Sequence, residues 1–119
     1  MEKFVEQTLL YDFYGELLNE HQRNIYKDVI FDDLSLSEIA DEYGISRQGV
    51  HDVVKRVNHS LSGYEEKLHL VEKFLSTKEK LYKIEKLTEQ ALSTNSDVLD
   101  KADVVRQIQR IVKEIIDNI

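Results

Sequence analysis

Residues 36–57 combine a small residue, a glycine and a capping serine at spacings that only a few backbone arrangements satisfy. Ala40 is small enough to lie where two helices cross closely, and Gly44, four positions later, can adopt the left-handed φ of a tight turn. Ser46 then stands where a second helix needs a side chain that accepts a backbone N–H. The segment therefore predicts two short helices joined by a turn, a helix-turn-helix. The apolar residues expected on its inward side are Leu36, Ile39, Tyr43, Ile45, Val50, Val53, Val54 and Val57.

The rest of the 119-residue chain is also helical in pattern. It contains no proline, the strongest helix breaker, and only four glycines. No stretch alternates polar and apolar residues in the way that predicts a strand. We therefore expect an all-α helical bundle that contains the helix-turn-helix and ends in long C-terminal amphipathic helices.

Capping residues and apolar spacing divide this pattern into separate helices. Ser35 with Glu38 predicts the start of the first motif helix, and Ser62 with Glu65 predicts a new helix after Gly63. The other helices are expected at about residues 2–18, 20–31, 47–62, 64–92 and 97–118, with a loop at 93–97.

Charge is spread unevenly along the chain, whose formal net charge is −7. Residues 1–45 hold three basic and eleven acidic residues, a net of −8, whereas residues 46–60 hold three basic residues and one acidic residue, a net of +2. So acidic a protein is not expected to bind polyanions or anionic membranes indiscriminately. The second motif helix carries the one basic island in the sequence, which is the charge distribution that a local DNA contact needs.

The outer side of this second helix carries residue types that recognise bases. When a helix-turn-helix binds DNA, the second helix lies in the major groove and its first turns face the base edges. Arginine can bind guanine through two hydrogen bonds, glutamine can bind adenine in the same way, and cations farther along the helix suit phosphates. The candidate DNA-binding residues are Arg47, Gln48, His51, Asp52, Lys55 and Arg56.

Two residues of this helix leave alternatives open. Asp52 either accepts a hydrogen bond from a cytosine amino group or repels phosphate and indicates another kind of partner. Gly49 lowers helix stability by about 0.5–1 kcal/mol relative to alanine. It either allows close approach to a groove or is simply tolerated. The basic cluster as a whole has the further alternative of being a solvated surface.

Catalysis, metal binding and secretion have no support in the sequence. The chain has no cysteine, and its four histidines lack the spacing of metal ligands. No nucleophile motif or phosphate loop is present, so we expect neither an enzyme nor a cofactor. The N-terminus does not resemble a signal peptide and no apolar run approaches bilayer length, so the expected location is the cytoplasm.

The segment from Leu17 to Leu61 resembles region 4 of bacterial sigma factors. The matching residues, in order, are Gln22-Arg23, Leu36, Glu38-Ile39-Ala40 and Gly44-Ile45-Ser46-Arg47, followed by a valine-rich helix. Together with YEEKLHLVEKF at 64–74 and the overall length, this pattern resembles the YlxM family of small bacterial helix-turn-helix proteins through about Leu92. The resemblance implies an all-α, cytoplasmic DNA-binding protein whose DNA-facing positions are Arg47, Gln48, His51, Asp52 and Lys55.

Two functions follow as hypotheses. The first is a DNA-binding regulator of transcription, a homodimer in which residues 1–62 form the helix-turn-helix domain, winged-helix-like or sigma-region-4-like. Residues 63–119 would then supply amphipathic helices for packing or dimerisation. The second is a non-enzymatic adaptor that keeps this fold but binds protein or ribonucleoprotein in the signal recognition particle pathway. Its basis is the net charge of −7 together with Asp52. The genes of the resembled family lie near that of the particle's GTPase, and the resemblance thereby implies a regulatory part in this pathway, which links the first hypothesis to it as well.

Overall fold

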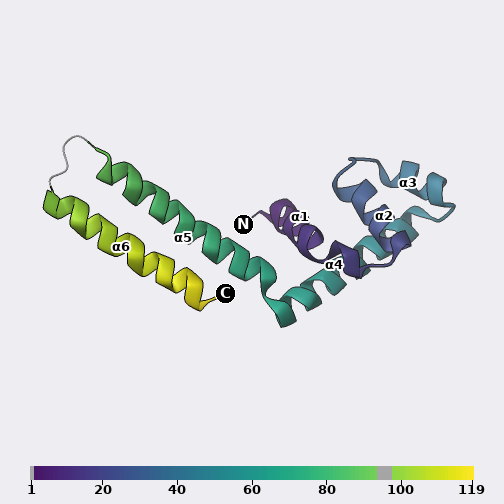
Figure 1. Cartoon of the computed structure of the whole chain (residues 1–119). Helices are drawn as coiled ribbons and strands as arrows, with labels where there is room; N and C mark the ends of the chain where they lie inside the picture. The colour runs from purple at the N-terminus through teal and green to yellow at the C-terminus, as the bar shows by residue number, and fades with distance from the viewer. Residues whose placement is uncertain (1, 94–97) are drawn as a thin grey trace. The chain divides into compact units, whose positions relative to one another are not determined.

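The computed structural model describes residues 2–93 and 98–119, and every regular element within them is a helix (Figure 1). The all-α prediction is therefore confirmed, and the described residues contain no strand that could form a wing. Most of the loop expected at 93–97 lies outside the described residues. The elements are α1 (Lys3–Tyr14), a 3-10 helix (Gly15–Leu17), α2 (Glu20–Ile30), α3 (Leu36–Tyr43), α4 (Arg47–Leu68), α5 (Leu70–Ala91) and α6 (Val98–Asp117).

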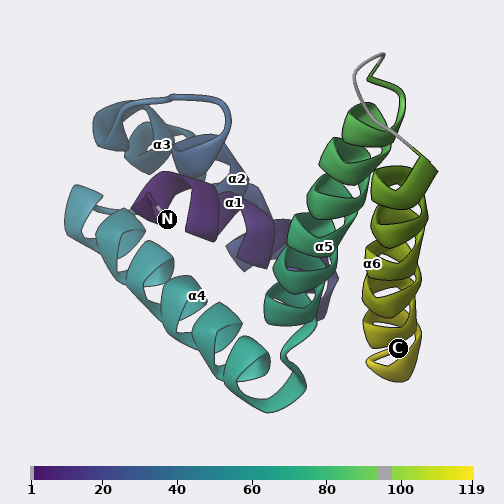
Figure 2. The same ribbon diagram turned by 90° about the vertical axis from the view of Figure 1, so that its left-hand side faces the viewer.

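The chain forms two compact units, Met1–Val71 and Glu72–Ile119. In the first unit α4 is the central element, because α1, α2 and α3 all contact it (Figures 1 and 2). A buried cluster of Ile25, Ile39, Ala40 and Val50 joins α2, α3 and α4. Ala40 lies in this cluster as the sequence predicts, since a larger side chain would push the two motif helices apart.

The capping residues of the first unit act as their spacing predicts. Asn19, Ser35 and Ser46 each precede a helix and accept a hydrogen bond from the backbone N–H three positions later, at 2.8, 3.1 and 2.9 Å. Gly44 ends α3 with φ of 67°, in the left-handed region that favours glycine. These local interactions fix both ends of the turn between α3 and α4.

The expected helix boundary at Gly63 is wrong, because α4 continues without a break to Leu68. Two contacts on either side of Gly63 hold the helix in place: Leu61 is fully buried, and the Tyr64 ring packs against Tyr14. Ser62 therefore caps no helix. The break comes at His69, a non-glycine residue with φ of 57°.

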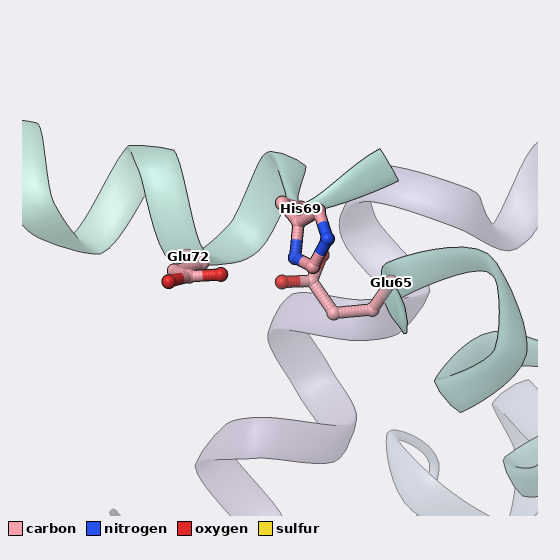
Figure 3. A group of neighbouring side chains, drawn as sticks. All are labelled: Glu65, His69 and Glu72. Carbon is pink, nitrogen blue, oxygen red and sulfur yellow. The ribbon is translucent and has the colours of Figure 1, made fainter. Parts of the chain in front are cut away.

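Glu65 lies beside His69 at this later break (Figure 3). Its Oε1 atom accepts hydrogen bonds from the Tyr14 hydroxyl and from the backbone N–H of Val71, at 2.9 Å for the latter, while the N–H of Leu70 donates to the Tyr14 oxygen at 3.1 Å. The first N–H groups of α5 thus gain partners from α1 and α4. A nitrogen of His69 and a carboxylate oxygen of Glu65 lie within 4.8 Å of each other.

Two expectations near the first helices also need correction. α1 ends at Tyr14, earlier than expected, and is followed by a 3-10 helix whose first residue, Gly15, packs closely on the Tyr11 ring. A Cβ atom at Gly15 would lie 3.2 Å from Cε2 of that ring. Leu36, expected on the inward side of the motif, is 39% exposed, since it lies in the first turn of α3 beyond the buried cluster.

The second unit consists of α6 and most of α5, which run antiparallel side by side in Figures 1 and 2. α5 runs without a break from Leu70 to Ala91. One side of α6 is partly or fully buried, at positions 104, 108, 111 and 115. A second apolar stripe, made of Val105, Val112 and Ile116, is exposed. No described helix is long and apolar enough to cross a membrane.

Candidate nucleic-acid interface

The six candidate DNA-binding residues lie in the first three turns of α4, and all of them are exposed. On the opposite side of the same helix, Val50 and Val57 are fully buried against the rest of the unit. The helix therefore separates a packed side from a free side, as its apolar spacing predicts. Arg47 is the first helical residue and follows the exposed cap Ser46, so its side chain is accessible at the start of the helix.

Cationic or potentially cationic residues recur every four positions along the free side. Arg47, His51, Lys55 and His59 all lie on it and are exposed. Side chains four positions apart are neighbours on a helix surface, so these residues form a continuous row rather than isolated charges. Among the described residues, no ion pair involves Arg47 or Lys55. The charge of the row is therefore available to a partner.

Gln48 and Asp52 are joined within this surface. The Gln48 Nε2 atom donates to the Asp52 Oδ1 atom at 3.0 Å, one turn along the helix. This bond gives Asp52 a neutral partner and leaves the neighbouring cations unpaired. It uses one of the two N–H donors of the Gln48 amide, so the other N–H and the amide oxygen remain available to an adenine.

Gly49 has a reason in the packing that neither sequence interpretation included. A Cβ atom at this position would lie 3.2 Å from Oγ of Ser46 and 3.6 Å from Cβ of Ile45. The Ser46 hydroxyl is held by its capping bond to the N–H of Gly49 itself. A side chain would therefore crowd the cap that starts α4, which explains a glycine inside the first turn.

Polar interactions between helices fix the position of α4. Asn58 accepts hydrogen bonds from the Tyr26 hydroxyl at 2.6 Å and from Gln7 Nε2 at 3.4 Å, and so links α4 to α2 and α1. The Tyr43 hydroxyl donates to Asp28 at 3.0 Å and links α3 to α2. Burial, followed by this bond to Asp28, raises the pKa of Tyr43 to about 12. The first set of bonds holds α4 against α1 and α2, and the second holds α3 against α2.

The structure brings together further polar residues that the sequence reasoning missed. A shallow depression of about 430 Å³ lies beside the row, lined by Gln22 of α2 and by Lys55, Arg56, His59 and Ser60 of α4. Lys55 and Arg56 were candidates, whereas the other three were not. The four-residue spacing from Lys55 to His59 is a signal that could have identified His59. Gln22 lies 33 positions before Lys55, and only the packing of α2 on α4 reveals its proximity.

The sequence has well-matched relatives. A family model described as "Putative helix-turn-helix protein, YlxM / p13 like" matches residues 1–105. The UPF0122 protein of Shouchella clausii is 40% identical over 105 residues, which cover 87% of this chain and 96% of the relative. The UPF0122 protein of Acetivibrio thermocellus is 38% identical over 118 residues, which cover 99% of this chain and 100% of the relative. That of Caldanaerobacter subterraneus is 51% identical over 86 residues, covering 72% and 71%.

Proposed function

Because the chain belongs to the UPF0122 family of YlxM-like helix-turn-helix proteins, we propose that it binds duplex DNA through the free side of α4 and regulates transcription in the cytoplasm. The observation that carries this proposal is the exposed row of Arg47, His51, Lys55 and His59 on a helix whose opposite side is buried. A rigidly held helix with a free, positively charged side fits the electrostatics of a major groove.

Each candidate residue has a role in this proposal. Arg47, in the first turn, binds a guanine edge, and His51 one turn later contacts the neighbouring base pair. Gln48 and Asp52 act as a pair joined by their 3.0 Å bond, in which Gln48 offers its second N–H and its amide oxygen to a base. Lys55 and Arg56, farther from the N-terminus, contact phosphates and set the register of the helix.

We further propose that the protein acts as a homodimer. Val105, Val112 and Ile116 form an exposed apolar stripe along α6 at spacings of seven and four residues. A second copy of the same stripe would bury it through a symmetric contact. The two motifs of such a dimer would need a separation of about 34 Å to reach successive turns of the major groove.

Fluorescence anisotropy tests the DNA-binding proposal directly. Labelled duplexes from bacterial promoter regions are titrated with the intact protein at low and moderate salt. We expect binding that weakens as salt rises, because bound cations displace counterions from the phosphates. Absence of binding at low salt, where phosphate attraction is greatest, would defeat the proposal.

The division of roles gives a sharper prediction. Arg47→Ala should remove the preference among duplexes, with a loss of about 1–3 kcal/mol on the preferred sequence and little change on others. Arg106→Ala, which removes an exposed arginine of α6, is the matched control and should leave both affinity and preference unchanged. If Arg47→Ala keeps the preference of the original protein, the base-reading side has been assigned to the wrong residues.

A second candidate function is an adaptor role toward protein or ribonucleoprotein in the signal recognition particle pathway. Asp52 favours it, because a carboxylate in the middle of the free side of α4 repels phosphates. The net charge of −7 also favours a partner other than free DNA. Co-purification with the particle's GTPase or RNA, lost in variants of residues 46–58, would support this role over the first.

A further inference from the structure

We propose that the depression beside the cationic row, formed by α2 and α4, is a phosphate-binding pocket that takes one backbone phosphate of the duplex. This proposal rests on the DNA-binding function above. It adds Gln22, His59 and Ser60 to the six candidate DNA-binding residues.

The composition of the pocket suits an oxyanion. Its five lining residues, Gln22, Lys55, Arg56, His59 and Ser60, include no acid. All five carry a hydrogen-bond donor, and an imidazole donates through at least one N–H in either protonation state. Among the described residues, no hydrogen bond or ion pair engages these five side chains. The donors therefore stay free for a ligand.

The surroundings of the pocket are consistent with this assignment. Carbon atoms make up most of its surface, as expected where long side chains lay their stems against one another and extend their polar ends. Asp52, the acid on the free side of α4, is not among the lining residues, and its Oδ1 atom already accepts from Gln48. A phosphate in the pocket is therefore not in direct contact with a carboxylate.

The position along α4 identifies the phosphate as part of the duplex backbone. Lys55 follows Arg47 by eight residues, which is about 12 Å along an α-helix. The major groove is about 8.5 Å deep. A helix that enters it with its N-terminus foremost and presents Arg47 to base edges therefore leaves the groove, at the level of the phosphates, at about Lys55. His59, one turn farther on the same side, is then beyond the bases and next to the backbone.

A duplex series carrying one uncharged methylphosphonate at successive backbone positions tests the proposal. The double variant Gln22→Ala/His59→Ala removes two pocket donors at solvent-accessible positions, and Lys67→Ala removes an exposed cation of α4 outside the pocket as the control. We expect a single methylphosphonate position to weaken binding of the original protein by about fivefold. The double variant should bind the unmodified duplex about as weakly as the original protein binds the duplex with that methylphosphonate. The methylphosphonate at that position should then cause no further loss of affinity for the double variant. Lys67→Ala should retain the penalty.

The possible results separate this proposal from the proposed function. If the protein binds duplexes but every methylphosphonate position weakens the original protein and the double variant equally, the pocket is not a backbone contact and DNA binding stands. If the original protein binds no duplex at low salt, the proposed function fails and this inference fails with it. If inorganic phosphate alone saturates the His59 imidazole signals in NMR at micromolar concentration, the pocket belongs to a free phosphate ligand, and the backbone assignment is overturned.

Discussion

Three tyrosine hydroxyls join helices of the first unit through hydrogen bonds to distant polar groups. Tyr26 donates to Asn58, Tyr43 donates to Asp28, and Tyr14 donates to Glu65. Burial raises the pKa of Tyr26 to about 12, and burial together with the bond to Asp28 does the same for Tyr43. The pKa of Tyr14 is raised by burial and then by its bond to Glu65. All three hydroxyls are thus held in the neutral form.

These shifts predict a loss of stability in alkali. A raised folded-state pKa means that the neutral phenol is favoured in the folded protein, so its contribution is complete below the ordinary pKa of 10.0. We expect the free energy of unfolding in urea to fall as pH rises from about 10 toward about 12. In a pH titration followed by phenolate absorbance, the Tyr26→Phe variant should lack one of the increases that the original protein shows above pH 10. Ionisation of Tyr26 and Tyr43 near pH 10 in the folded protein would contradict this prediction.

At the residue scale, sequence reasoning found the capping residues but not these tyrosine contacts. Asn19, Ser35 and Ser46 bond to a backbone N–H only three positions away, so the local sequence contains the whole interaction. The partner of Tyr14 is 51 positions distant. No periodicity in the sequence connects two such residues, because their meeting depends on how α1 packs on α4.

At the scale of an element, helix α4 likewise has one end that the local sequence predicts and another that depends on distant contacts. Its start at Arg47 was predicted from Ser46 and Gly44, whereas its end was placed too early, at Gly63. Glycine weakens a helix by about 1 kcal/mol but does not end it. The buried side chain of Leu61 and the contact between Tyr64 and Tyr14 offset that cost. The helix ends where the Glu65 carboxylate accepts a hydrogen bond from the backbone N–H of Val71.

Gly63 inside α4 and Gly44 at the end of α3 give a pair of opposite predictions for stability. Gly63 lies inside α4, and a Cβ atom there would meet nothing within 4 Å, so Gly63→Ala should raise the free energy of unfolding by about 0.5–1 kcal/mol. Gly44 has φ of 67°, so Gly44→Ala should lower it by about 1 kcal/mol or more. Urea unfolding followed by circular dichroism measures both. Destabilisation by Gly63→Ala would argue for a break at that position.

At the scale of the whole molecule, the proposed homodimer predicts sensitivity to charge on one stripe of α6. Val112→Lys combined with Ile116→Lys places two charges on the exposed apolar stripe, which would be buried by a second copy. We expect the original protein to sediment as a dimer and this variant as a monomer. Glu114→Lys lies on the opposite, exposed side of α6 by helical periodicity and should leave the dimer intact.

A monomer in sedimentation experiments with the original protein would remove the homodimer from the proposal. It would leave the DNA contact of a single motif to be tested by anisotropy. The charge of the whole chain bears on both measurements, because two copies with a net charge of −7 each repel one another at low salt. The dimer is therefore expected to strengthen as salt rises, whereas DNA binding is expected to weaken.

The sequence by itself determined the all-α class, the motif at 36–57 and the free side of α4, because these depend on interactions within about four residues and on helical periodicity. Only the tertiary structure decided where α4 ends, why position 49 is a glycine, and that Gln22 lies beside Lys55 and His59. Two of these features join residues of different helices, and the third is the crowding of a capping hydroxyl by a Cβ atom. Such contacts follow from three-dimensional packing, which spacing along a chain does not encode.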